Sequence, residues 1–483
     1  MPIYQNFQSL CEEQNIVDFE DLIFMTIRML TRDEDILSRI KKRYQYVFID
    51  EYQDLNFGQY ELVKLLFKNS HIVAIGDPDQ SIYGFRGSDN KYFKSFTNDF
   101  PGCEKILLNR NYRSTQTILD ASFQMITKTS NSKETSNSEV CKIFSDIRTE
   151  KKLILKETAT EYAEAVAIGR MIEKFVGGTS FFSMDAGKIN PDEHKEYAFS
   201  DFAILYRTSR QCETFIKVFE KEGIPFQAAD TKNIYDIDGI KQVLSFCRII
   251  NNSASFLDFE IAADHFEQKT SSKNKKSFLK KKMEEFYREI KDCDNATSIR
   301  MICEKTGLKQ IIEKNDKTKL KFDQLLSIAE NCSNLKTFLD YIALNQDVDT
   351  IEYDTQKVSL LTMHAAKGLE FPIVFVAGCE QGLIPFVRKG KNGKGKNRDD
   401  KNIDDIEEER RLFYVAMTRA MDILCLSYAK KRNIYGVNNP KSTNKNRQRS
   451  IFIDDIENSL TQIVKSHFFV KPVKKAKQLE MFE

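Results

Sequence analysis

The sequence predicts an α/β fold in which helices alternate with the strands of parallel sheets. Short apolar runs, typical of strands that are buried on both faces, lie at 46–50, 71–77, 201–207, 358–364, 371–378 and 423–429. Amphipathic helical patterns separate many of these runs, for example at 57–69 and 161–175. This alternation is the pattern of parallel sheets covered by helices.

The stretch from about 252 to 345 departs from that alternation. It carries charged helical patterns, such as 277–292 and 318–332, and few strand-like runs. We interpret it as a mostly helical insertion between two parts of one α/β domain.

Composition indicates a soluble protein of several domains. The chain has 483 residues, 41% of them hydrophobic and 30% charged. It contains neither an apolar run near the roughly 20 residues that span a bilayer nor a secretory signal pattern. We therefore expect a cytoplasmic protein with no membrane partner. The ten cysteines include no C-x-x-C pair, which favours free thiols.

The net charge of +2 does not by itself indicate a nucleic-acid partner. Basic residues nevertheless cluster at 273–282, 388–398, 441–449 and 471–477. Each cluster fits either a solvated loop or a surface that contacts a polyanion.

The first motif, YVFIDEYQD at 46–54, places two carboxylates directly after a buried strand. Ligands of parallel sheets bind at this carboxyl end. Asp50 can hold Mg²⁺, which prefers one or two carboxylates together with phosphate oxygens. Glu51 can position or deprotonate an attacking water. An ordinary acidic turn is the alternative.

The second motif, AIGDPDQSIYGFRG at 74–87, also follows a strand. The Gln80 amide stands where it could sense the terminal phosphate of a nucleotide. The remainder interleaves aromatic rings with a cation, which suits single-stranded nucleic acid because rings stack on bases and guanidinium groups bind phosphate. These residues are Tyr83, Phe85 and Arg86. A Gly-rich turn with core aromatics is the alternative.

The third motif, LLNRNYRS at 107–114, offers Arg113 for a phosphate and Tyr112 for stacking on a base. In this order and spacing, the three strings resemble helicase motifs II, III and IV of the UvrD/Rep/PcrA group of superfamily 1. Further strings resemble motif IVa (201–208), motif V (360–376) and motif VI (407–420). The resemblance covers roughly residues 15 to 455.

The resemblance implies ATP and Mg²⁺ as cofactors. It assigns Asp50 and Glu51 to Mg²⁺ and water activation, and Gln80 to the γ-phosphate. Arg113 and Arg419 would act as arginine fingers that stabilise charge in the transition state.

The resemblance also implies contacts to adenosine and to DNA. Tyr112 would stack on the adenine, and Glu370 would meet the ribose beside Lys367 and Gly368. Thr362 and His364 would line the DNA track. Phe85 stands where many members carry Trp, and this chain contains no Trp.

The implied organisation is a pair of RecA-like (P-loop NTPase) motor domains, the first of them truncated. Its parts are the C-terminal part of the first domain (1–113), the first part of the second domain (114–250), a helical accessory insertion (251–351), the second part of the second domain (352–460) and a flexible tail (461–483).

A phosphate-binding loop of the form G-x-x-x-x-G-K-[ST] does not occur in the 483 residues. The nearest string, 436–443, has Pro440 in place of the second glycine. A truncated gene model, a split gene whose missing N-terminal helicase half would be a partner, or a decayed copy would each explain this. We also expect a first domain of low stability, because its sheet would have exposed edges.

The end of the chain resembles the short peptide with which many bacterial repair proteins bind the sliding clamp. The residues concerned are Gln478, Leu479, Met481 and Phe482. A chance amphipathic end is the alternative.

These motifs together indicate an ATP-dependent 3′–5′ DNA helicase or translocase of the UvrD type that acts in DNA repair or replication. Its expected partners are single-stranded DNA and junctions between single-stranded and duplex DNA. The alternative function is a catalytically inactive DNA-binding or clamp-adaptor protein.

Overall fold

The structure is a computed structural model. It describes residues 2–14, 16–68, 70–128, 142–147, 151–177, 197–228, 237–251, 253–254, 256–267, 284–286, 288–290, 293–344, 355–386, 398–432 and 446–465. The chain forms two compact units. One comprises Met1–Gln227 with Thr355–Glu483, and the other comprises Ala228–Asp354. The finer division of the chain into helicase domains stays a prediction.

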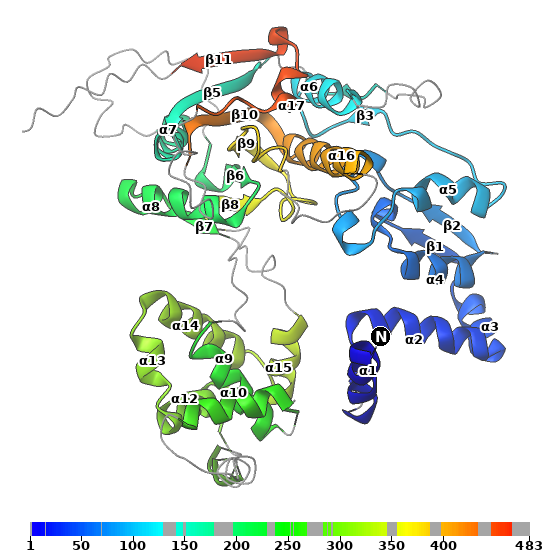
Figure 1. The fold of residues 1–483 in the computed structure, drawn as a ribbon, viewed down its shortest axis with the longest axis vertical. Coiled ribbons are helices and arrows are strands. Elements are labelled where there is room, and N and C mark those ends of the chain that lie inside the picture. Colours follow the sequence, from blue (N-terminus) through cyan, green and yellow to red (C-terminus); the bar gives the residue numbers. More distant parts are fainter. Residues whose placement is uncertain are drawn as a thin grey trace, which may run out of the picture. The chain divides into compact units, whose positions relative to one another are not determined.

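The N-terminal part of the larger unit is built around a two-stranded parallel sheet (Figure 1). Its strands are β1 (Tyr46–Ile49) and β2 (His71–Ala74), in register Tyr46 to His71. The helices are α1 (Pro2–Gln14), α2 (Phe19–Arg32), α3 (Glu34–Arg43), α4 (Phe57–Phe67) and α5 (Lys91–Asp99). Capping boxes at Asp18 and Asn56 fix the starts of α2 and α4.

The rest of the larger unit is organised by a seven-stranded sheet of order β11-β5-β10-β9-β6-β8-β7. The five pairings that have a defined register are parallel. The strands are β5 (Leu153–Thr160), β6 (Phe202–Tyr206), β7 (Phe226–Ala228), β8 (Val358–Thr362), β9 (Phe371–Ala377), β10 (Ala420–Lys431) and β11 (Thr461–Lys465). The predicted α/β fold class is confirmed.

Burial explains why the central strands appear in the sequence as unbroken apolar runs. Every residue of β6 is buried, and six of the seven residues of β9 are buried. Helices pack on this sheet: α7 contacts β5 and β10, and α16 contacts β9 and β10. The helices and the short strand pair of this region are α6 (Gln116–Thr127), α7 (Glu161–Phe175), α8 (Cys212–Glu222), α16 (Arg398–Met417), α17 (Ile451–Asp454), β3 (Arg110–Asn111) and β4 (Phe144–Ser145).

The smaller unit has its own hydrophobic core, in which Phe246, Ile299 and Phe338 are buried. Its helices are α9 (Ile240–Ile250), α10 (Phe256–Glu267), α12 (Asn295–Thr306), α13 (Lys309–Glu313), α14 (Asp316–Glu330) and α15 (Leu335–Leu344).

The segment 461–483, which the sequence assigned to a tail, begins with an ordered strand. β11 pairs in parallel with β5 at the edge of the sheet. The run TQIVK is too short for a sequence pattern to separate from a loop. The clamp-binding residues Gln478, Leu479, Met481 and Phe482 lie outside the described residues, as do most of the basic clusters.

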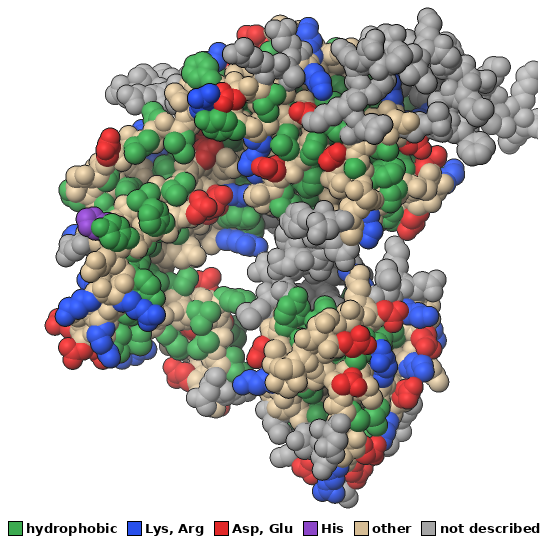
Figure 2. All heavy atoms as spheres, turned by 180° about the vertical axis from the view of Figure 1, so that it is seen from behind, with side chains coloured by type: hydrophobic (Ala, Val, Ile, Leu, Met, Phe, Trp, Pro, Cys, Tyr) green, Lys and Arg blue, Asp and Glu red, His purple; other side chains and the backbone are tan. Residues whose placement is uncertain are grey.

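Large hydrophobic side chains are exposed mainly in the N-terminal part. Tyr46 and Phe48 on one face of the small sheet are 69% and 71% exposed, and Val73 on the neighbouring strand is 44% exposed. Figure 2 shows hydrophobic side chains gathered on the side where β1 and β2 lie. Parallel sheets are normally covered on both faces, so the exposure of this face departs from the usual arrangement.

Within the described residues, the nine cysteines form no disulfide, and no cluster of metal-ligating side chains is found. The search of the described helices for a membrane-spanning segment found none.

Candidate functional site

The carboxyl end of β1 presents two exposed carboxylates in a strained turn. Asp50 Oδ1 accepts a hydrogen bond from the Glu51 backbone N–H at 2.9 Å. Glu51 has φ 51° and ψ 39°, a left-handed conformation that costs a non-glycine residue about 1–3 kcal/mol. The next residue is fixed to the neighbouring strand, because the Tyr52 N–H donates to the Ile75 carbonyl at 3.0 Å.

Amide side chains join the loop after β1 to the loop after β2. The Gln53 amide nitrogen donates to Glu51 Oε2, and its oxygen accepts from the Asp77 N–H at 3.1 Å. Gln80 Nε2 donates to Asp77 Oδ2 at 2.9 Å. Gly76 leaves room for this arrangement, because a Cβ there would lie 2.3 Å from Gln53 Oε1.

Lys367, in the loop after β8, reaches across to the carboxylates of the first sheet. Its side chain is 7% exposed, and Nζ pairs with Asp54 and, at 3.2 Å, with Glu51. Nζ also donates to the Gln80 carbonyl at 2.8 Å. Burial raises the pKa of Asp54, and the nearby Glu51 adds to this, while Lys367 opposes it.

Arg419, between α16 and β10, is 3% exposed and also reaches Gln80. It donates to Gln80 Oε1 at 3.2 Å and to the Leu369 carbonyl at 3.1 Å. Burial, and then the neighbouring Arg113, lower the pKa of Arg419 to about 10, so the guanidinium stays charged at neutral pH. Arg113 Nε pairs with Glu370 Oε2 at 2.5 Å.

Six of the residues that the sequence assigned to a nucleotide site are therefore linked by direct contacts. They are Glu51, Gln80, Lys367 and Arg419 in one group, and Arg113 with Glu370 in a second. Asp50 lies next to Glu51, and Gly368 (φ 84°) forms the turn after Lys367. Tyr112 is 68% exposed, and the Arg110 guanidinium lies 5.4 Å from its ring centroid.

The candidate DNA-binding residues form an aromatic group beside these contacts. The Phe85 ring lies edge-on to His364 at 5.7 Å and to Tyr83 at 6.1 Å. The Arg86 guanidinium lies 5.6 Å from the Phe85 ring centroid. Phe85 is 61% exposed, which leaves its ring accessible to a base. Thr362 Oγ1 accepts from the Ala365 N–H at 3.2 Å, which orders the turn that leads to His364.

His364 is uncharged at neutral pH. Burial lowers the pKa of His364 to about 4, and the positive charges of Arg207 and Arg86 contribute. Its ring therefore supports Phe85 as a neutral aromatic group, and the positive charge at this surface comes from the arginines.

Three participating residues lay inside the quoted motifs, yet sequence reasoning did not select them. Gln53, Asp54 and Asp77 complete the carboxylate and amide network described above. Glu409 pairs with Arg207 at 2.6 Å and accepts from the Phe386 N–H at 2.9 Å. The signal that could have identified them is their position in strings already recognised as motifs.

The glutamates 407–409 do not form a solvated helix start. The helix α16 begins at Arg398, so they lie within it, and Glu409 is buried. Taken alone, consecutive glutamates are typical of a solvated helix start, but Glu408 and Glu409 contact other elements.

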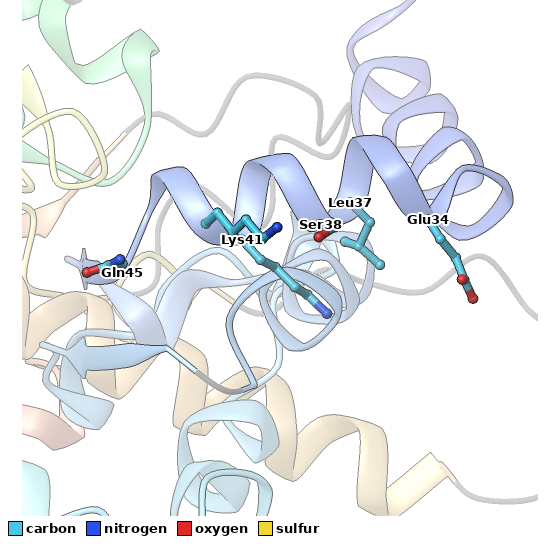
Figure 3. Close-up of a pocket in the computed structure, with 6 residues that line it drawn as sticks. Glu34, Leu37, Ser38, Lys41 and Gln45 are labelled. Atoms are coloured by element: carbon cyan, nitrogen blue, oxygen red, sulfur yellow. The ribbon is translucent and has the colours of Figure 1, made fainter.

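A shallow depression on α3 lies apart from these residues (Figure 3). Its lining consists of Glu34, Leu37, Ser38, Lys41, Lys42 and Gln45. None of the predicted site residues is among them.

The donor set fits a magnesium nucleotide in part. Asp50 and Glu51 supply the carboxylate oxygens that Mg²⁺ prefers. The Asp54 carboxylate is already paired with the Lys367 ammonium, so it does not need the ion as a counter-charge.

The site thus combines carboxylates at strand ends with charged groups from a second sheet, and an aromatic–cation surface lies beside them. Residues 1–101 match the family model of the UvrD/REP helicase N-terminal domain. Residues 106–300 and 254–431 match that of the UvrD-like helicase C-terminal domain. The chain therefore belongs to the UvrD-like helicase family.

Two curated proteins of similar sequence are described as ATP-dependent DNA helicases. The ATP-dependent DNA helicase PcrA of Staphylococcus aureus strain Mu50 is 31% identical over 510 residues, which cover 95% of this chain and 64% of the relative. The PcrA of Staphylococcus epidermidis strain RP62A is 31% identical over 488 residues, which cover 90% and 62%. The chain thus spans about 64% of the length of the first relatives it matches.

One solved structure was also similar. It is the C-terminal domain of a possible DNA helicase from Lactobacillus plantarum WCFS1, at 12% identity and a TM-score of 0.27, over 73% of this chain and 98% of that one. A similarity at this level carries no argument about the fold.

Proposed function

We propose that the chain forms most of an ATP-dependent DNA helicase or translocase that moves 3′ to 5′ along single-stranded DNA in repair or replication. The observation that carries this proposal is the contact of Lys367 and Arg419 with Glu51 and Gln80. Residues that lie about 290 to 340 positions apart meet at one set of strand ends, where a nucleotide would link the two sheets.

In this proposal each residue of the site has a separate role in ATP hydrolysis. Asp50 holds the Mg²⁺, Glu51 orients and deprotonates the attacking water, and Gln80 contacts the γ-phosphate. Arg419 and Arg113 neutralise the charge that develops on the transferred phosphoryl group.

Other residues of the chain contact the adenosine part of ATP and the DNA strand. Tyr112 stacks on the adenine, and Glu370 binds the ribose close to Lys367 and Gly368. The DNA strand runs over Tyr83, Phe85, Arg86, Thr362 and His364, of which the exposed Phe85 ring stacks on a base. The preferred substrates are single-stranded DNA and its junctions with duplex DNA.

The change that tests the proposed catalysis is Glu51→Gln. The glutamine keeps the size of the side chain but cannot take a proton from water. DNA-stimulated ATP hydrolysis should fall about 10²–10⁴-fold, while binding of single-stranded DNA stays unchanged. The assay uses this chain together with the polypeptide that supplies the phosphate-binding loop.

Glu61→Gln on α4 is the matched control and should keep wild-type hydrolysis. Equal activity of the Glu51→Gln and wild-type proteins would remove the catalytic assignment. A wild-type protein that binds DNA and never hydrolyses ATP would favour the adaptor function.

We further propose that the open face of the β1–β2 sheet binds the polypeptide that carries the phosphate-binding loop. Two parallel strands alone are marginally stable in water, and Tyr46, Phe48 and Val73 are exposed on one face. A further layer of parallel strands and helices would bury these side chains and supply the loop next to Asp50. The clamp-binding tail remains a separate proposal.

The partner proposal predicts that a coding segment with the loop motif lies in frame with, or next to, the segment that encodes Met1. Its product should copurify with this chain when the two are co-expressed. Phe48→Glu should abolish copurification, because burying the introduced charge is costly. Ile451→Glu, at a side chain that is 40% exposed on α17, is the control and should leave it intact. Copurification that survives Phe48→Glu would exclude this face.

A further inference from the structure

The loop from Gln80 to Arg86, which carries the candidate DNA-binding aromatic residues, contacts the helix α16. Arg411 Nε on this helix donates to the Ser81 carbonyl at 2.7 Å. Tyr83 follows Ser81 by two residues in the same loop. The Lys367 Nζ, which comes from the loop after β8, lies 5.3 Å from the Tyr83 ring centroid. The loop between Gln80 and Arg86 therefore depends on contacts from the second sheet and its helices for its position.

Glu408, one turn before Arg411, makes the contact closest to the aromatic residues. Its half-buried carboxylate lies against the backbone of Gly84, and the N–H groups of Gly84 and Phe85 lower the pKa of this carboxyl. A Cβ at Gly84 would lie 2.8 Å from Glu408 Oε2, so only glycine permits this approach. Burial raises the pKa of Glu408, and Glu409 adds to this, while Arg411 and the two N–H groups oppose it.

The contact supplies a cap that the loop lacks. Residues Gly84–Arg86 form a single 3-10 turn, and its N-cap residue, Tyr83, makes no side-chain cap hydrogen bond. The Glu408 carboxylate instead brings a negative charge from another element close to the first N–H groups of this turn. Because Phe85 belongs to this turn, the position of its ring depends on that carboxylate.

We propose that Glu408 is a positioning residue for single-stranded DNA: by its close contact with the Gly84 backbone, it sets the Phe85 ring for stacking and ties the loop from Gln80 to Arg86 to α16. This inference rests on the proposed function, since it assumes that DNA runs over Phe85. The chain continues from α16 directly to Arg419, so the same helix touches both the DNA loop and the residue assigned to ATP.

Positioning and simple electrostatics predict opposite effects of removing this carboxylate. A negative charge beside a DNA track repels phosphate, so deleting it for electrostatic reasons alone would tighten binding. If Glu408 instead positions Phe85, Glu408→Ala should weaken binding, because the ring no longer stacks in place. Glu408→Gln keeps one acceptor oxygen and should stay close to wild type.

The experiment measures the affinity of the full chain for a fluorescent oligothymidylate. Glu408→Ala should raise Kd about 10-fold, the size of one lost base stack. Asp405→Ala, an exposed acid one turn earlier on the same helix, is the matched control and should leave Kd unchanged or lower it. Gly84→Ala should weaken binding as well, and it should add little to Glu408→Ala, because both changes break one contact.

Hydrogen exchange of the Gly84 and Phe85 amides gives a second measurement that needs no DNA. Both amides should exchange faster in Glu408→Ala and at the wild-type rate in Asp405→Ala. Unchanged exchange, or a Kd that stays the same or falls in Glu408→Ala, would overturn the assignment of Glu408. A wild-type chain that does not bind the oligonucleotide would instead overturn the proposed function, and with it the DNA role of Glu408.

Discussion

Arg419→Ala is expected to lower the kcat of DNA-stimulated ATP hydrolysis by about 10³–10⁵-fold, the range measured for arginine fingers. The guanidinium is 3% exposed and bonded to the Gln80 amide, so its charge acts where water screens it poorly. A rate assay on the assembled motor, at saturating ATP and DNA, measures the effect.

The KM for ATP should change far less than kcat, because the charge on the phosphoryl group develops in the transition state. Arg300→Ala is the matched control, since that arginine is 53% exposed in the helical unit and pairs with Glu330. A rise in KM with unchanged kcat would assign Arg419 to ATP binding and would contradict the finger assignment.

The second large effect concerns the stability of the seven-stranded sheet. Arg432, at the end of β10, pairs with Glu164 and, at 2.9 Å, with Glu380. Both glutamate side chains are 0% exposed, and the arginine side chain is 7% exposed. Glu164 also accepts from Ser427 at 2.7 Å and from the Gly378 N–H at 3.0 Å, so the cluster joins α7 to the ends of β9 and β10.

Arg432→Met should lower the free energy of unfolding by about 3–5 kcal/mol, because two buried carboxylates lose their main counter-charge. Chemical denaturation followed by circular dichroism measures the change. Lys430→Met on the same strand is the control: its ion pair with Glu157 is 48% and 33% exposed, and its loss should cost less than about 1 kcal/mol.

Adding Glu164→Gln and Glu380→Gln to Arg432→Met should recover part of the lost stability, since no buried charge then remains unpaired. A loss below that of Lys430→Met would show that Arg447, which lies 3.5 Å from Glu380, already neutralises the cluster.

Local sequence was sufficient to predict the main strands and which residues lie at their ends. The run at 371–378 is apolar because β9 is buried on both faces of a parallel sheet. The run at 46–50 also forms a strand, but β1 has no buried residue, contrary to the burial that its sequence predicts. A carboxylate pair that directly follows such a run must lie at the carboxyl end of a strand, so Asp50 and Glu51 were found without a structure. The helix α7 was predicted with its observed limits, 161–175.

Short strands gave no usable sequence pattern. β3 and β4 have two residues each, and β7 has three. Segments of this length cannot show a period, and they are strands only because a neighbouring strand offers them hydrogen bonds. The edge strand β11 was assigned to a tail for the same reason.

The sequence by itself therefore determined the fold class, the family and the residue types at each strand end, because each of these depends on a local pattern of about ten neighbouring residues. Only the tertiary structure decided which of these ends meet. Lys367 pairs with Glu51, Arg419 with Gln80 and Glu408 with the Gly84 backbone, across separations of more than 300 residues. No local pattern specifies such a contact, because it depends on strand order and on the packing of α16, which the whole chain settles together.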